Sequence, residues 1–235
     1  RMNTGALIRA PLFGLLTLIL CLLQWGLPTT REVQTFAALL LVMVWGVFFA
    51  MVLKWGIEGW RATPSSLRQF MGLVMILGAW ASFSLSKDRG THFLVSVLVL
   101  VWTADIGAYF VGKAWGKNKL APVLSPGKSR EGALGGWVLV LILGWIWVYL
   151  ESLLSPESSS IYTLLWTKGP VYFVLGLSAL VVCSVLGDLF ESLVKRSAGF
   201  KDSSQLLPGH GGVLDRIDAL LPTVPLAWCL AHWVS

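Results

Sequence analysis

Aspartates in two short stretches have the residue type and spacing to bind a metal ion. Asp215 and Asp218, in GHGGVLDRID, are three residues apart and would share one face of a continuous helix. Asp188 ends an apolar run in SVLGDLFESLVKR, and antiparallel packing of that run against the next would bring all three carboxylates to one depth. Crowded carboxylates repel unless a cation compensates them, and oxygen-only ligands favour Mg²⁺. The spacing predicts a metal centre of Asp188, Asp215 and Asp218.

Structural roles for the same residues stay open. Asp215 is also suited to capping a helix start, and Asp218 to pairing with Arg216 or a nearby lysine. Glu191 precedes Lys195 by four residues, which predicts a supporting ion pair on a helix.

A further carboxylate lies inside an apolar run. Asp105, in VLVWTADIGAYF, must face protein or water there, which indicates a functional role. A hydrogen bond to Tyr109, one helical turn later, is the structural alternative.

Two polar, glycine-rich segments have the chemistry to bind phosphate. The stretch 112–132 carries Lys113 and Lys117, which share a face if the preceding helix continues, and Lys128 and Ser129 after a Pro-Gly turn. Lysine ammonium groups and exposed backbone donors suit phosphate. The alternative is that these lysines set membrane topology and contact anionic headgroups. The sequence PGKS is not a P-loop, because the first glycine and the preceding strand are missing.

His210 stands between two glycines in the second polar segment, at 201–221. It is suited to donating a hydrogen bond to a phosphate or to shaping the turn, and general-base catalysis is the least favoured of its roles.

Composition indicates the setting of these residues. The chain has 235 residues, of which 56% are hydrophobic and 13% charged, whereas soluble domains carry about 25% charged residues. An all-α polytopic membrane protein is therefore expected, and the net charge of +6 is not evidence for nucleic-acid binding. The three cysteines lie in apolar runs and suggest neither disulfides nor a zinc site. Seven runs approach the ~20 residues of a transmembrane helix: 10–28, 35–53, 69–86, 93–112, 132–150, 170–187 and 213–234.

The basic residues predict an orientation for these spans. Fourteen of the 18 lie in alternate connecting segments, which the positive-inside rule places in the cytoplasm together with the N-terminus. Both polar segments then face the cytoplasm. Pro222 and Pro225 are expected to kink the last span.

The segment SLVKRSAGFKDSSQLLPGHGGVLDRID, 192–218, resembles the signature of the phosphatidate cytidylyltransferases (CDP-diacylglycerol synthases). The matching positions are Ser192, Lys195, Arg196, Lys201, Asp202, Pro208, His210, Gly211, Gly212, Asp215, Arg216 and Asp218. Upstream, GAYFVGKAWGKNKLAPVLSPGKSREGALGG, 107–136, is similar to the family's loop, and Asp105 and Asp188 match its other acidic positions. The likeness covers roughly 91–234.

The resemblance implies a bacterial inner-membrane enzyme, usually dimeric, that makes CDP-diacylglycerol and pyrophosphate from CTP and phosphatidate. It implies a catalytic Mg²⁺ centre at Asp188, Asp215 and Asp218, with a second cation as an open alternative. Substrate contacts are expected from Asp105, Lys128, Ser129, Lys195, Arg196, Lys201, His210 and Arg216.

The chain divides accordingly into N-terminal membrane helices, 1–90, and a catalytic membrane region, 91–235. It is shorter than typical members, which is compatible with the absence of an N-terminal span. An ion-coupled transporter is the main rival function, although its carboxylates would be expected near the membrane midplane. A CDP-alcohol phosphotransferase is a second rival, but its DG-x2-AR sequence is absent.

Overall fold

The long apolar runs of the sequence form long helices. The computed structural model describes residues 15, 17, 19–20, 31–154, 159–206 and 211–234. Its elements are α2 (Arg31–Lys54), α3 (Gly56–Ala62), α4 (Ser65–Arg89), α5 (Thr91–Trp115), β1 (Lys119–Ala121), β2 (Ser125–Ser129), α6 (Arg130–Leu154), α7 (Ile161–Thr167), α8 (Pro170–Ser197), α9 (Leu214–Ile217) and α10 (Leu220–Val234).

Five segments in the described part are long and apolar enough to cross a membrane: α4, α5, α6, α8 and Leu214–Val234. The chain is therefore an integral membrane protein of the all-α class. A sixth candidate joins Leu39–Met51 to Gly56–Ala62, and this pair bends by 116°. The predicted run 10–28 lies almost entirely outside the described residues, so the count of seven spans stays a prediction.

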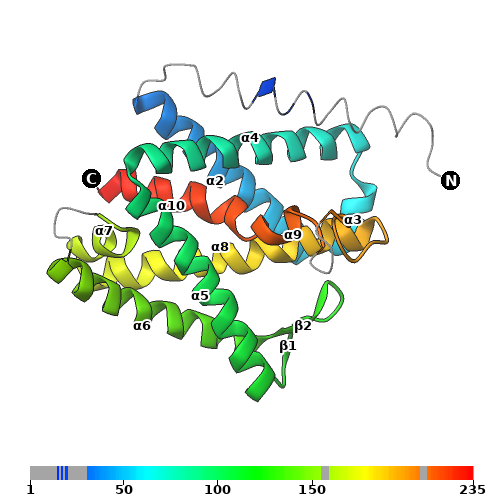
Figure 1. Cartoon of the computed structure of the whole chain (residues 1–235). Helices are drawn as coiled ribbons and strands as arrows, with labels where there is room; N and C mark the ends of the chain where they lie inside the picture. The colour runs from blue at the N-terminus through cyan, green and yellow to red at the C-terminus, as the bar shows by residue number, and fades with distance from the viewer. Residues whose placement is uncertain are drawn as a thin grey trace.

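The packing of α8 against α10 confirms the predicted neighbourhood of the last two spans. Figure 1 shows α8 running through the middle of the bundle, with α10 beside it in the opposite direction. Their contact lies in a core that also includes α5, α6 and α7. A second core joins α2, α3 and α4 to the end of α8, where the Phe48 and Phe190 rings stack at 5.1 Å.

Glycines allow α5 and α6 to pack with their backbones in contact. A Cβ atom on Gly132 would lie 2.6 Å from the carbonyl oxygen of Ala108, and one on Gly107 would lie 2.9 Å from the Cα atom of Gly136. A Cβ atom on Gly136 would collide with the carbonyl oxygen of Ala104. Small residues at such positions are typical of tightly packed membrane helices.

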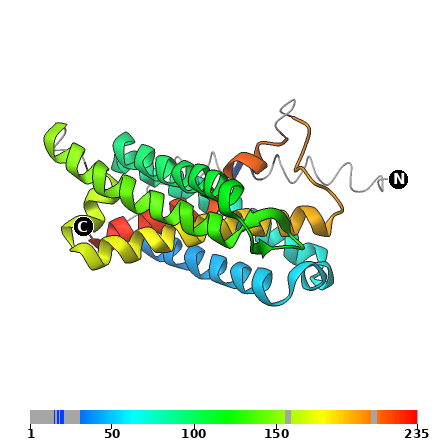
Figure 2. The same cartoon turned by 90° about the horizontal axis from the view of Figure 1, so that it is seen from below.

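A short β-hairpin connects α5 to α6, a feature that the sequence analysis did not predict. Strands β1 and β2 are antiparallel, with Lys119 opposite Ser129. Figures 1 and 2 show the hairpin at the end of the bundle that also holds α3 and the C-terminal end of α8, whereas α7 lies at the other end. The hairpin therefore brings the predicted phosphate-binding loop to the end of α8 that carries Asp188.

Candidate functional site

Three aspartates and one lysine from different elements lie within electrostatic range of one another, and we call Asp105, Asp188, Asp218 and Lys128 the carboxylate cluster. The Lys128 Nζ lies 2.5 Å from an Asp188 carboxylate oxygen. Asp105 in α5 and Asp218 between α9 and α10 lie within electrostatic range of both groups. Three carboxylates thus share one lysine, and their excess negative charge would favour an additional cation.

The approach of two backbones brings Asp218 to Asp188. Gly187 precedes Asp188, and a Cβ atom there would lie 2.7 Å from both the carbonyl oxygen of Asp218 and the ring of Pro222. Only a residue without a side chain allows α8 to approach the start of α10 this closely. Asp218 is consequently buried, while about a quarter of the Asp188 side chain is exposed.

Asp215 belongs to a second group of charges, which we call the Lys195 cluster. Lys195 pairs with Glu191 and also, at 2.5 Å, with one oxygen of Asp215. The Glu191–Lys195 pair confirms the prediction from their spacing. The other Asp215 oxygen accepts bonds from the Ser203 amide at 2.9 Å and hydroxyl at 2.6 Å, and from the Gly212 amide at 2.7 Å. Asp215 therefore holds both ends of the 203–212 segment against α8.

The two clusters are adjacent, because Asp218 lies within electrostatic range of Glu191. Of the three predicted metal ligands, Asp188 and Asp218 come together with Asp105, whereas Asp215 belongs to the Lys195 cluster. Both oxygens of Asp215 accept hydrogen bonds. Both oxygens of Asp188 also have partners, the Lys128 ammonium and, at 3.5 Å, the Ser192 hydroxyl. Asp215 lies in the first turn of α9, as the sequence indicated. Its role as a metal ligand stays a prediction.

Asp105 lies among charged groups, and its functional role stays a prediction. Its charged neighbours are Lys128 and Asp188. Tyr109 instead lies under the Lys113 ammonium, 5.8 Å from its ring centre, and is exposed.

The predicted phosphate-binding loop is held together by its own side chains. Glu131 accepts hydrogen bonds from the Lys117 amide at 3.2 Å and the Asn118 side chain at 2.6 Å. Lys117 lies beyond the end of α5 and so does not continue its face with Lys113. The Ser129 hydroxyl accepts from the Gly132 amide at 3.1 Å, which caps the start of α6.

The remaining predicted basic residues lie on α8, in the loop after it and on α9. The Arg196 guanidinium donates to the carbonyl oxygen of Leu124 at 3.4 Å and so links α8 to the hairpin. Lys201 is exposed in the loop after α8, and Arg216 is exposed in α9. His210 lies outside the described residues.

The donor set of the carboxylate cluster suits Mg²⁺, although it does not enclose an ion by itself. Among the described residues, no three Asp, Glu, His or Cys side chains converge closely enough to hold a metal. Mg²⁺ is commonly held by only one or two carboxylates, with waters and substrate phosphates completing its shell. Asp188 and Asp218 provide such a pair.

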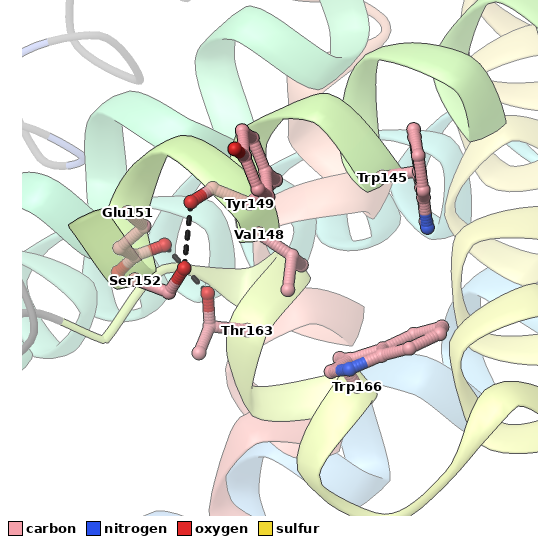
Figure 3. Close-up of a pocket in the computed structure, with 7 residues that line it drawn as sticks. All are labelled: Trp145, Val148, Tyr149, Glu151, Ser152, Thr163 and Trp166. Carbon is pink, nitrogen blue, oxygen red and sulfur yellow. Dashed lines mark hydrogen bonds between the residues drawn. The ribbon is translucent and has the colours of Figure 1, made fainter.

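A cavity at the opposite end of the bundle contains a carboxylate that has a structural role. It has a volume of about 490 Å³ and lies between α6 and α7, lined by Trp145, Tyr149 and Trp166 among others (Figure 3). Its carboxylate, Glu151, accepts bonds from the Ser160 amide at 2.9 Å and the Thr163 hydroxyl at 2.6 Å. Because Ser160 is the N-cap of α7, Glu151 fastens that helix to α6.

The sequence of this chain is similar to those of known proteins. Residues 2–234 match the cytidylyltransferase family. The chain belongs to this family. The chain is 50% identical over 137 residues to the phosphatidate cytidylyltransferase of Haemophilus influenzae, a match that covers 58% of this chain and 44% of the relative.

Two further relatives with the same name are similar. That of Pseudomonas aeruginosa is 42% identical over 200 residues, 81% of this chain and 67% of the relative. That of Bacillus subtilis is 40% identical over 141 residues, 60% of this chain and 48% of the relative. The chain thus spans 44% to 67% of the length of these relatives.

Proposed function

We propose that this cytidylyltransferase transfers a cytidylyl group from CTP to phosphatidate, giving CDP-diacylglycerol and pyrophosphate. The observation that carries the proposal is the carboxylate cluster, in which a phosphate-suited loop brings Lys128 to Asp188. The family and the names of the relatives support the same reaction.

The proposed step is an in-line displacement at phosphorus. An oxygen of the phosphatidate phosphate forms a bond to the α-phosphorus of CTP, while the bond from that phosphorus to the bridging oxygen of the β-phosphate breaks. Pyrophosphate leaves with the bonding electrons. A phosphate monoester has a second pKa of about 6, so the nucleophile is already ionised at neutral pH and needs no strong base.

The main barrier is the approach of two anions, which positive groups at fixed positions reduce. We propose that Lys128, Arg196, Lys201 and Arg216 contact phosphate oxygens from the hairpin, α8 and the loops that follow. Lys195, also expected from the sequence to contact substrate, keeps Glu191 and Asp215 in place. The Asp105 carboxylate would interact electrostatically with the Lys128 ammonium.

Mg²⁺ would be held by Asp188 and Asp218. When bound, such an ion neutralises charge on phosphate oxygens. Asp215 would support this site by holding the 203–212 segment against α8.

In this mechanism His210 donates a hydrogen bond and does not remove a proton. His210→Gln retains a donor of similar size, so we expect it to lose less activity than Asp218→Asn. The shape of its pH–rate profile between about pH 7 and 9 should match that of the wild type, because the nucleophile is ionised throughout that range. A basic limb that appears only in the wild type would contradict this role.

We propose further that the protein lies in a bacterial inner membrane as a homodimer of seven-span chains. The distribution of basic residues supports a cytoplasmic hairpin and a cytoplasmic loop after α8. Phosphatidate would then reach the site from the inner leaflet.

Incubation of the purified protein with CTP, phosphatidate and Mg²⁺ tests the proposal. We expect CDP-diacylglycerol and pyrophosphate in equal amounts. A CDP-alcohol phosphotransferase would instead consume CDP-diacylglycerol and release CMP when given an alcohol. A transporter would form no nucleotide product from either mixture, and either result would contradict the proposal.

A further inference from the structure

A second cavity, larger than the first, lies between α6 and α8 and reaches the hairpin. It has a volume of about 800 Å³, within the ~300–1,000 Å³ typical of ligand pockets. Its walls are apolar side chains of α6 and α8, among them Leu134, Val182 and Leu186. Leu120 and Leu124 of the hairpin region and Leu53 at the end of α2 also line it. We call it the α6–α8 cavity.

The hairpin connects this cavity to the carboxylate cluster. Leu124 lines the cavity, while Lys128, four residues later, pairs with Asp188. On α8, Leu186 and Leu189 line the cavity on either side of Asp188 in the sequence. A molecule whose head lies at the carboxylate cluster can therefore have its apolar part in the α6–α8 cavity.

One charged side chain lies at the rim of the cavity. Arg130 follows the hairpin at the start of α6 and is exposed. Within the described part of the chain, its guanidinium makes no hydrogen bond or ion pair. An arginine beside an apolar cavity complements an amphiphile with an anionic head, because guanidinium binds phosphate oxygens through paired N–H groups.

A hydrogen bond joins two walls of the cavity, two helical turns along α6 from Arg130. Trp137 of α6 donates from its indole nitrogen to the Ser178 hydroxyl of α8 at 2.8 Å. From Leu189 near the rim to Ser178, α8 rises by roughly 16 Å, the length expected of an ideal helix. The cavity thus extends along α8, with Arg130 at one end and the Trp137–Ser178 pair at the other.

We propose that the α6–α8 cavity is the subsite for one acyl chain of the lipid substrate, with Arg130 binding its phosphate at the rim. This inference rests on the proposed function and specifies how that site selects its lipid. The Trp137–Ser178 pair sets the length of acyl chain that the cavity holds. The remainder of a longer chain extends past this pair into the membrane.

The test compares the wild type with variants that fill the cavity. Val182 is half-exposed on the α8 wall, so Val182→Trp narrows the cavity without disturbing the core. Val171→Trp is the matched control, on the same helix and similarly exposed but outside the cavity. Each protein is assayed for CDP-diacylglycerol formation with dioctanoyl and with dipalmitoyl phosphatidate in mixed micelles.

We expect Val182→Trp to raise the ratio of kcat/KM for dioctanoyl over dipalmitoyl phosphatidate by about tenfold or more, as loss of a few methylene contacts would. Val171→Trp should leave this ratio at the wild-type value. Leu134→Trp on the α6 wall gives the same test independently if Val182→Trp does not fold. Arg130→Gln should raise the KM for both lipids by about tenfold, the effect of one lost charge-assisted bond, with the KM for CTP unchanged.

The outcomes separate the two proposals. A wild type inactive on both lipids would contradict the proposed function. An active wild type whose chain-length ratio is the same in Val182→Trp, Leu134→Trp and Val171→Trp would overturn the acyl subsite alone. The subsite is also overturned if Val182→Trp converts a dimer into a monomer without changing the ratio, because a second copy of the chain would then fill the cavity.

Discussion

At the scale of single residues, Lys195 stabilises the fold through two ion pairs. Its ammonium group lies between Glu191, which is buried, and Asp215, which holds the 203–212 segment. Removing one partner of a buried ion pair leaves an uncompensated charge, which typically costs about 3–5 kcal/mol. We therefore expect Lys195→Met to lower the stability markedly, measured as the unfolding temperature in detergent.

A second substitution identifies the cause. Glu191→Gln removes the stranded charge, so the double variant Lys195→Met/Glu191→Gln should recover part of the lost stability. Lys113→Met is the control, because Lys113 is exposed and lies over the Tyr109 ring. Equal stability of Lys195→Met and Lys113→Met would contradict the role given to Lys195.

The residue spacing predicted some of these partners and not others. Glu191 and Lys195 pair because they lie one turn apart in an unbroken helix. Asp215 and Asp218 were predicted to share a face, and the turn between them is helical, because the Asp218 amide donates to the Leu214 carbonyl oxygen at 3.0 Å. The two carboxylates nevertheless have different partners: Asp215 pairs with Lys195, whereas Asp218 lies near Asp188. Spacing along a helix does not predict which tertiary partner each carboxylate meets.

At the scale of elements, the contact between α5 and α6 depends on glycine. Gly136→Ala would drive a Cβ atom into the carbonyl oxygen of Ala104, so the helices must separate. We expect a loss of about 1–3 kcal/mol, typical of overpacking, measured by unfolding in detergent. Gly72 in α4 has no atom within 4 Å of such a Cβ, so Gly72→Ala should be neutral or stabilising by up to ~1 kcal/mol. Similar effects of the two substitutions would refute this explanation.

Hydrophobicity alone predicted the apolar helices, because a run that crosses the membrane must satisfy its backbone hydrogen bonds internally, as a helix does. It did not predict the bend after α2, where Gly56 adopts a φ of 57°. The hairpin was also missed, since its strands are short, rich in proline and glycine, and without an alternating pattern. Tertiary contacts support it instead: Lys128 with Asp188, and Arg196 with Leu124.

At the scale of the whole molecule, the two ends of the bundle differ in charge and should lie on opposite sides of the membrane. The hairpin lies at one end and α7 at the other (Figure 1). A cysteine in place of exposed Val123, in the hairpin, should resist an impermeant thiol reagent applied to intact cells. A cysteine in place of Lys168, which ends α7, should react. The reverse pattern would invert the orientation.

The sequence predicted which charged residues lie at the site better than it predicted the cavities that form between the helices. Lys128, Asp188 and Asp218 do come together, because the hairpin, α8 and the segment before α10 meet there. The α6–α8 cavity had no sequence signal, since its walls are ordinary apolar residues of two helices distant in the chain.

The central claim is that Asp188 and Asp218 form the catalytic carboxylate pair of a cytidylyltransferase, and one assay tests it most directly. CDP-diacylglycerol formation is measured against Mg²⁺ concentration for the wild type, Asp188→Asn and Asp218→Asn, with Asp88→Asn as an exposed control in α4. Each asparagine preserves shape and removes a charge that a hard cation requires. We predict losses of about 100-fold or more for both site variants, with unchanged folding, and full activity for the control. Near-normal turnover of either site variant at low Mg²⁺ would contradict the claim.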